Sequence, residues 1–165
     1  MTESMWIRRR VDKHDRLSAI ARYVDGKLID PARLRDALEV LLRPGDRVAL
    51  EGDNQKQADF LSRTLAQCDP GKVNGLHMLI SSVSRPEHLD LFEQKIAATL
   101  DLAYAGPQSV RIAQMVDDGQ VRIGAIHTYV ELCLHLGDTG VRPHEVLRRK
   151  PPRLTGRLSR IALAD

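Results

Sequence analysis

The stretch RPGDRVALEGDNQKQADFLSRTLAQCDPGKVNGLHMLISSV, residues 43–83, decides the fold. It opens with a turn, continues as a short buried strand over 47–50, and then changes to a helical spacing of apolar residues over about 55–67. Asp69-Pro70-Gly71 ends that helix, and LHMLISSV at 76–83 reads as a second strand. A strand, a helix and a strand joined by short turns form the unit from which parallel sheets are built.

The same alternation extends in both directions along the chain. Upstream, Asp30-Pro31 is a typical helix start, and leucines then recur at helical spacing as far as Leu42. Downstream, two capping boxes mark further helix starts, Ser84 with Glu87 and Thr128 with Glu131, and Gly106-Pro107 is another helix start. Two more strands are expected over 100–105 and 121–126. We therefore expect an α/β domain over residues 30–136, a parallel sheet flanked by helices.

The two ends of the chain do not share this pattern. Residues 1–29 read as a polar lead-in with one short helix around Leu17 to Tyr23. Residues 137–165 carry seven Lys and Arg against three Asp and Glu, which leaves 18 bases and 19 acids before them. The net charge of +3 therefore belongs to this basic, Pro- and Arg-rich tail, which we expect to be irregular and poorly ordered.

Composition excludes several classes of protein. No apolar run approaches the roughly 20 residues of a membrane span, and charges stand where a signal peptide needs its apolar stretch, so we expect a cytoplasmic protein without a membrane. Cys68 and Cys133 lack any CxxC spacing, which predicts reduced thiols and no metal site. The stretch from Arg142 to Arg160 has few aromatic neighbours and no recognisable fold, so we do not expect nucleic-acid binding.

Ligands of open parallel sheets bind beyond the carboxyl ends of the strands, which here gathers four segments. They are residues 51–55, 81–84, 104–109 and 124–128. The first, Glu51-Gly52-Asp53-Asn54-Gln55, combines a carboxylate, a glycine and two amides at a helix start, where free backbone N–H groups can hold a carbonyl or carboxylate oxygen. The alternative is that Asp53 or Asn54 only caps the helix.

Familiar catalytic and nucleotide-binding motifs are missing from the sequence. It contains no GxGxxG, no P-loop and no GxSxG, so Ser81 and Ser82 read as hydrogen-bonding groups at a strand end rather than as nucleophiles. His127 is a candidate ligand contact, or else a polar residue at a helix start. No general acid–base pair is evident, and the catalytic residue stays unassigned.

Several stretches together resemble the amino-terminal part of the malonate decarboxylase α subunit, which is itself similar to family I CoA-transferases and to the citrate lyase α chain. The resemblance runs from about Trp6 to Leu132, and EGDNQKQADFLSR is its most specific marker. It is carried by KHDRL (13–17), VDGKLIDPARLRDALE (24–39), RPGDRVALEGDNQKQADFLSRTLAQCDP (43–70), VNGLHMLISSVSRPEHLDLFE (73–93), AYAGPQS (103–109) and VRIGAIHTYVEL (121–132).

The resemblance implies an acyl-carrier-protein transferase that exchanges acetate for malonate on the thioester of the carrier. Its partners would be the acyl carrier protein and the decarboxylase subunits, and its substrate would include the phosphopantetheine-type, dephospho-CoA-derived arm of the carrier, with no bound cofactor. The acyl group or the arm would then contact residues of three segments: Glu51, Gly52, Asp53, Asn54, Gln55, Ala105, Gly106, Pro107, Gln108, Gly124, Ala125 and His127. In related CoA-transferases the catalytic glutamate lies in a second, carboxyl-terminal domain.

The sequence departs from the family after Leu132, where CLHLGDTGVRPHEVLRRKPPRLTGRLSRIALAD follows instead of further strands. We therefore expect an incomplete, truncated domain with impaired transferase activity. The alternative function is a non-catalytic module that binds the thioester or the acyl carrier, or that assists assembly.

Overall fold

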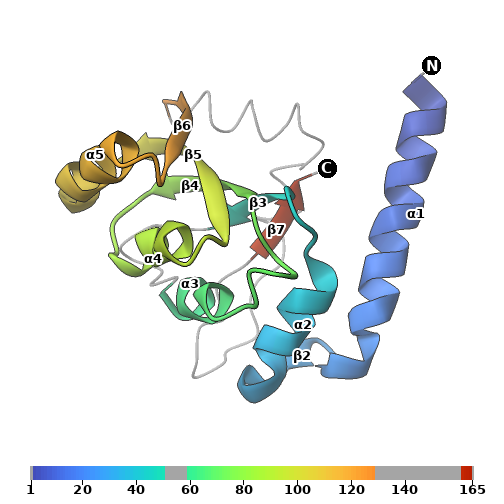
Figure 1. Ribbon diagram of the computed structural model, residues 1–165. Helices are drawn as coiled ribbons and strands as arrows, with labels where there is room; N and C mark the ends of the chain where they lie inside the picture. The colour runs from blue at the N-terminus through green and yellow to red at the C-terminus, as the bar shows by residue number, and fades with distance from the viewer. Residues whose placement is uncertain (1, 51–58, 129–160, 165) are drawn as a thin grey trace.

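The computed structural model describes residues 2–50, 59–128 and 161–164. Its main element is a five-stranded sheet in the order β6-β5-β4-β3-β7 (Figure 1). The strands are β3 Arg47–Leu50, β4 Leu76–Ser82, β5 Ala97–Tyr104, β6 Arg122–Ile126 and β7 Ile161–Ala164. The first four are mutually parallel, and β7 pairs antiparallel with β3. The predicted α/β architecture with a parallel sheet is thus confirmed.

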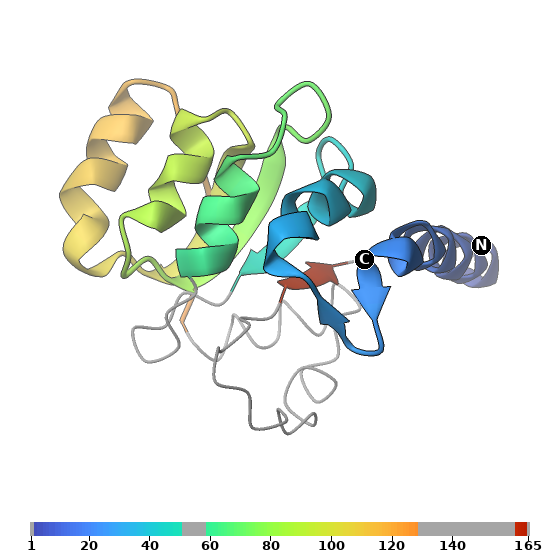
Figure 2. The same ribbon diagram turned by 90° about the horizontal axis from the view of Figure 1, so that it is seen from below.

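Four helices lie side by side along one face of the sheet (Figure 2). They are α2 Leu34–Leu41, α3 Asp59–Ala66, α4 Glu87–Glu93 and α5 Ser109–Asp117. Because the parallel strands follow each other in chain order, each helix crosses over the same face before the next strand is added. The helices run back against the strands, so their amino ends and the carboxyl ends of the strands share one edge.

The core lies between this helical layer and the sheet. Alternate strand residues point into it, such as Val48 and Leu50 of β3 and Met78 and Ile80 of β4, all at most 2% exposed. The helices contribute leucines and a phenylalanine at helical spacing, among them Leu61, Leu65, Leu89 and Phe92. Each fully buried side chain of this size stabilises the fold by about 1.5–3 kcal/mol, so this one cluster holds the layers together.

The amino-terminal segment differs from its prediction. In place of a short helix around Leu17 to Tyr23, the helix α1 covers Thr2–Ile20, and a 3-10 turn, η1 Ala21–Tyr23, follows it. A hairpin, β1 Val24–Asp25 with β2 Leu28–Ile29, leads from there to the 3-10 turn η2, Pro31–Arg33. Two ion pairs attach α1 to the rest of the domain: Arg16 pairs with Asp46, and Asp12 pairs with Arg43.

Two further details correct the predicted helix and strand boundaries. The helix α4 begins at Glu87 with Pro86 as its N-cap, not at the Ser84 capping box, because a residue that precedes proline, here Arg85, disfavours helical backbone. The strand β5 is longer than predicted and starts at Ala97. By contrast, Asp30 does cap the turn before α2, accepting a hydrogen bond from the Ala32 N–H at 2.9 Å.

Parts of the carboxyl-terminal third lie outside the described residues, including Glu131 of the second capping box and residues 137–160 of the tail. Where the tail is described, Ile161–Ala164 forms β7, although no strand was predicted there. The apolar run IALA has only four residues, too few to show a strand period. Its strand conformation comes from pairing with β3, which is far away in the sequence. In the described part of the chain, no helix is long and apolar enough to cross a membrane.

Candidate functional site

The carboxyl ends of β4, β5 and β6 meet at one edge of the sheet, as the parallel arrangement predicts. Backbone hydrogen bonds continue across this edge beyond the strands themselves. The N–H of Val83 donates to the Tyr104 carbonyl at 2.9 Å, and the N–H of His127 donates to the Leu102 carbonyl at 2.8 Å. We call the described residues 81–84, 104–109 and 124–128 the carboxyl rim.

The rim brings two of the three predicted binding segments onto neighbouring strands. Ala105 to Gln108 follow β5, while Gly124 to His127 form the end of β6, which pairs with β5. The third predicted segment, Glu51, Gly52, Asp53, Asn54 and Gln55, lies outside the described residues. The described part of the site is therefore formed by β5, β6 and the start of α5.

Gly106 shapes the loop after β5. Its φ is +55°, a left-handed backbone that side-chain-bearing residues avoid, and a Cβ there would lie 3.1 Å from the Tyr104 ring. Pro107 then opens the 3-10 turn η3, Gly106–Gln108, which leads directly into α5. The chain thus turns sharply at the sheet edge and leads the amino end of α5 to the rim. The N–H groups of Gln108 and Ser109 are bonded within this turn, to the Ala105 and Gly106 carbonyls.

Gly124, one of the predicted binding residues, has a packing role in the described structure, and its contact with a ligand stays a prediction. The pairing of β5 with β6 shifts at this point, with Leu100 opposite Ile123 and Asp101 opposite Ala125. A Cβ on Gly124 would lie 2.3 Å from Oδ1 of Asp101. This glycine is therefore the extra residue of a bulge, and its lack of a side chain makes room for a buried carboxylate.

Asp101 belongs to a polar network that crosses the sheet on the face opposite the core. Its side chain is only 3% exposed. Oδ2 lies 2.8 Å from Nε2 of His77 on β4 and 3.3 Å from a guanidinium nitrogen of Arg47 on β3. Beside it, Arg122 on β6 donates to the Thr99 hydroxyl at 2.9 Å.

Sequence reasoning did not find this network, although a charged residue inside the apolar strand LDLAYA was a signal for it. The register places Arg47, His77, Thr99 and Arg122 next to one another on four successive strands. These four residues lie toward the amino ends of the strands, whereas Asp101 stands opposite Ala125. The network ties the strands together, and it reaches the rim where Asp101 and His77 lie against Gly124.

Charged residues near the amino ends of α3 and α4 are already paired with each other. The Asp59 carboxylate contacts Arg63 and lies 3.8 Å from Arg85, and Glu87 lies 3.4 Å from Arg63. These guanidiniums are thus neutralised by carboxylates of the protein. The described rim segments themselves contain hydroxyl, amide, imidazole and apolar side chains but no carboxylate.

Two other titratable side chains are buried in the helical layer. Burial raises the pKa of the Cys68 thiol to about 12, so this thiol stays protonated and unreactive. His88 on α4 is fully buried, and desolvation lowers the pKa of its imidazole. Cys133, the second predicted free thiol, lies outside the described residues, and the described part of the chain holds no group of three metal-ligating side chains.

Comparisons with known proteins agree on one family. A family model described as malonate decarboxylase, alpha subunit, transporter matches residues 5–137. The acetyl-S-ACP:malonate ACP transferase of Malonomonas rubra is 44% identical over 131 residues, which make up 79% of this chain and 24% of that protein.

Solved structures give the same result. A malonate decarboxylase alpha subunit from Acinetobacter baumannii is 53% identical, with a TM-score of 0.76 over 79% of this chain and 24% of that one. A chain of a Pseudomonas malonate decarboxylase hetero-tetramer in complex with malonate is 57% identical, with a TM-score of 0.76 over 80% of this chain and 24% of that one. The chain thus spans about a quarter of the length of these relatives.

Proposed function

This chain belongs to the malonate decarboxylase alpha subunit family, and on that premise we propose that it forms the thioester-binding part of an acyl-carrier-protein transferase. In the proposed reaction, malonate replaces the acetyl group on the carrier, so that acetyl-S-carrier and malonate become malonyl-S-carrier and acetate. The observation that carries this proposal is the family match over residues 5–137, at 44–57% identity to malonate decarboxylase proteins.

The carboxyl rim has features that would bind the thioester in this reaction. When a carboxylate attacks a thioester, negative charge develops on the carbonyl oxygen, and backbone N–H groups fixed in place stabilise it. At the rim this role falls to side-chain donors, those of Gln108 and His127, because the N–H groups of Gln108 and Ser109 are bonded to the Ala105 and Gly106 carbonyls within the turn. Tyr104 and Ile126, which are 60% and 72% exposed, offer apolar surface to the carrier arm.

We assign the acyl group and the phosphopantetheine-type arm to Ala105, Gly106, Pro107, Gln108, Gly124, Ala125 and His127, together with the segment from Glu51 to Gln55. Within this set Gly124 contributes through the bulge that positions Ala125 and His127, not through direct contact. The carrier protein and the decarboxylase subunits are the proposed partners, and the cytoplasm is the proposed location.

A second candidate is a module that binds the acyl carrier without turning it over. It is favoured by the absence of any carboxylate from the rim segments that the structure describes, since an attacking glutamate would have to come from elsewhere. Both candidates bind the carrier at the same site. The second differs from the first only in that no acyl group is exchanged.

One assay separates the two candidates. Acetylated carrier protein of a malonate decarboxylase is incubated with malonate and the purified chain, with and without a polypeptide covering the remaining length of a family relative. Malonyl carrier, detected by intact mass spectrometry, supports the transferase. Capture of the carrier without exchange in either mixture supports the binding module, and the absence of both contradicts both.

A further inference from the structure

The helix α1 presents apolar side chains to solvent and polar ones to the body of the protein. Asp12, Arg16 and Ile20, spaced four residues apart, face the body, where Arg16 pairs with Asp46 and Asp12 pairs with Arg43. Ile7 and Val11, also four apart, are 58% and 55% exposed. Among the described large apolar side chains of α1 only Ile20 is buried, whereas in a usual surface helix the apolar stripe faces the core.

A second row of side chains runs beside Ile7 and Val11. Arg10, Lys13 and Leu17 follow one another at spacings of three and four residues, so they form a neighbouring row on the helix surface, and Leu17 is half exposed. Arg8 is exposed as well. We call the side chains of Ile7, Arg8, Arg10, Val11, Lys13 and Leu17 the outer surface of α1.

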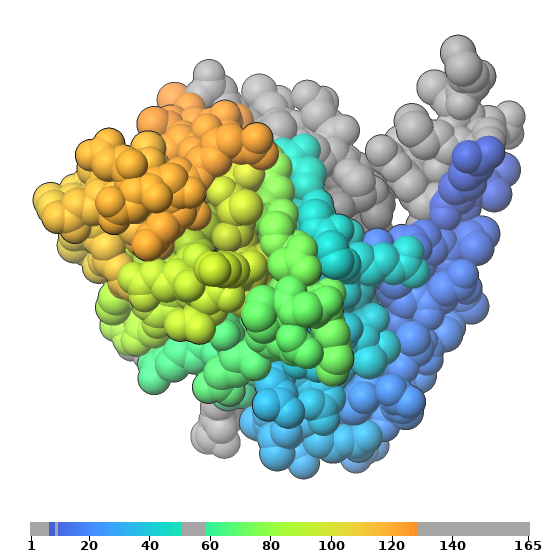
Figure 3. All heavy atoms as spheres, in the orientation of Figure 1, coloured from blue at the N-terminus to red at the C-terminus, as the bar shows by residue number. Residues whose placement is uncertain are grey.

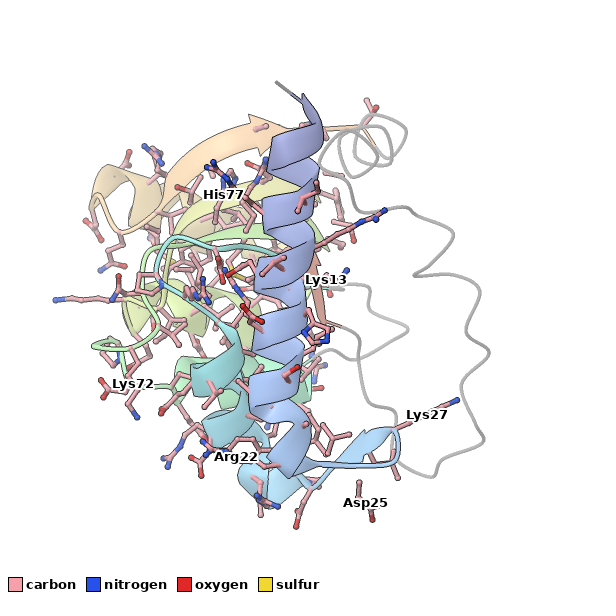
Figure 4. All side chains as sticks on the ribbon, turned by 90° about the vertical axis from the view of Figure 1, so that its right-hand side faces the viewer. Lys13, Arg22, Asp25, Lys27, Lys72 and His77 are labelled. Atoms are coloured by element: carbon pink, nitrogen blue, oxygen red, sulfur yellow. The ribbon has the colours of Figure 1, made fainter. Side chains whose placement is uncertain are left out.

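The charge of this side of the molecule is strongly basic. Arg8, Arg10 and Lys13 pair with no carboxylate among the side chains that the structure describes, and Arg22 and Lys27 lie at the foot of α1 (Figure 4). Among the described side chains of residues 7–27, the exposed acids are Asp15 and Asp25. In the space-filling view, α1 forms a ridge along one side of the molecule (Figure 3).

We propose that the outer surface of α1 is a docking site for an acidic amphipathic helix of another polypeptide. The apolar row supplies the hydrophobic contact, and the basic residues beside it select carboxylate-bearing neighbours, as charged positions flanking a helix seam do. The 19 residues of α1 span about 28 Å, which is enough length for several turns of a partner helix.

Charge complementarity distinguishes this occupant from a second copy of the chain. Pairing two outer surfaces of α1 would bring Arg8, Arg10 and Lys13 of both copies together, and like charges across a helix pair oppose association. An acidic helix meets the same residues with opposite charge. The proposal does not depend on acyl transfer, so it stands or falls separately from the proposed function.

The test uses the full chain and a synthetic amphipathic helix of about 20 residues, long enough to form stable turns, with leucines on one face and glutamates beside them. A peptide with lysines in place of the glutamates is the matched probe. We expect the glutamate peptide to bind, in a salt-sensitive manner, at least tenfold more tightly than the lysine peptide by fluorescence anisotropy.

Variants locate the binding on α1. Val11→Glu and Lys13→Glu are expected to weaken binding of the glutamate peptide at least tenfold, whereas Val110→Glu on α5, a valine that is 68% exposed, should leave it unchanged. Circular dichroism checks that each variant stays folded. Equal binding of both peptides, equal binding by the α1 variants, no binding, or self-association of the chain through α1 would each overturn the proposal.

Discussion

Asp101 on β5 and Gly124 on β6 are neighbours across the sheet, and the buried Asp101 carboxylate fits only because residue 124 has no side chain. The carboxylate of Asp101 fills the space in which a side chain of residue 124 would stand, with only 2.3 Å between its Oδ1 and the position of a Cβ. The same carboxylate reaches His77 on the next strand, so a glycine in β6 helps to hold three strands in register.

Gly124→Ala tests this relationship. We expect it to lower the free energy of unfolding by about 2–4 kcal/mol, because the added methyl group would overlap the buried carboxylate. In an Asp101→Ala background the same substitution should cost less, since only the contacts of the new Cβ with Thr99 Cγ2 at 2.9 Å and His77 Nε2 at 3.2 Å then remain. Chemical denaturation of the four proteins measures both effects, and equal costs in the two backgrounds would contradict the packing role.

We expect the buried imidazole of His88 to lower the free energy of unfolding in mild acid. Burial lowers the pKa of its imidazole in the folded state below the usual value of 6.5. The unfolded chain then binds the proton more readily, so the stabilisation is complete above pH 6.5 and decreases as the pH falls below it, by at most about 1.4 kcal/mol per pH unit.

The measurement for His88 is the free energy of unfolding between pH 7.5 and about 5, compared with two variants. His88→Leu, which fills similar volume without a titrating group, should remove part of the pH dependence. His14→Leu is the matched control, because His14 is almost fully exposed. A pH profile that His88→Leu leaves unchanged would rule out this source of acid sensitivity.

Lys95 occupies a backbone conformation that favours glycine. Its φ is +61°, and it ends α4 in a Schellman turn in which the Ile96 N–H donates to the Leu91 carbonyl at 2.9 Å. We expect Lys95→Gly to raise the free energy of unfolding by about 0.5–1 kcal/mol. Gln94→Gly, one residue earlier at φ −81°, should lower it. Equal effects of the two substitutions on thermal denaturation would argue against strain at Lys95.

The Asp46 carboxylate connects α1 to the rest of the domain. Both of its carboxylate oxygens accept hydrogen bonds from Arg16, and one also accepts from the Arg43 N–H at 2.8 Å. Asp46→Asn removes the charge of a largely buried pair, which should cost about 1–3 kcal/mol and speed hydrogen exchange of the α1 amides. Asp36→Asn breaks an exposed pair with Arg35 and is expected to change neither. Unaltered exchange in α1 would show that other contacts hold the helix.

The prediction of the fold succeeded where local pattern and tertiary structure agree. Residues 47–50 and 76–83 alternate with amphipathic helices, and the parallel sheet follows from connection rules alone. The extent of α1 was not predicted, because it is stabilised by ion pairs with residues about 30 positions away, and such pairs leave no periodicity. The position of the rim residues 105–108 and 124–127 was predictable from strand ends, whereas the role of Gly124 depends on the register between β5 and β6.

The central proposal for this chain is that the carboxyl rim binds the thioester. The decisive measurement is a titration of the isotopically labelled chain with S-acetyl phosphopantetheine, followed by NMR of the backbone amides. We predict shifts that cluster at residues 105–109 and 124–128 and that are lost in a Gln108→Ala/His127→Ala variant. Shifts that instead cluster at the amino ends of the strands, around Arg47, Leu76 and Ala97, or no shifts at all, would contradict it.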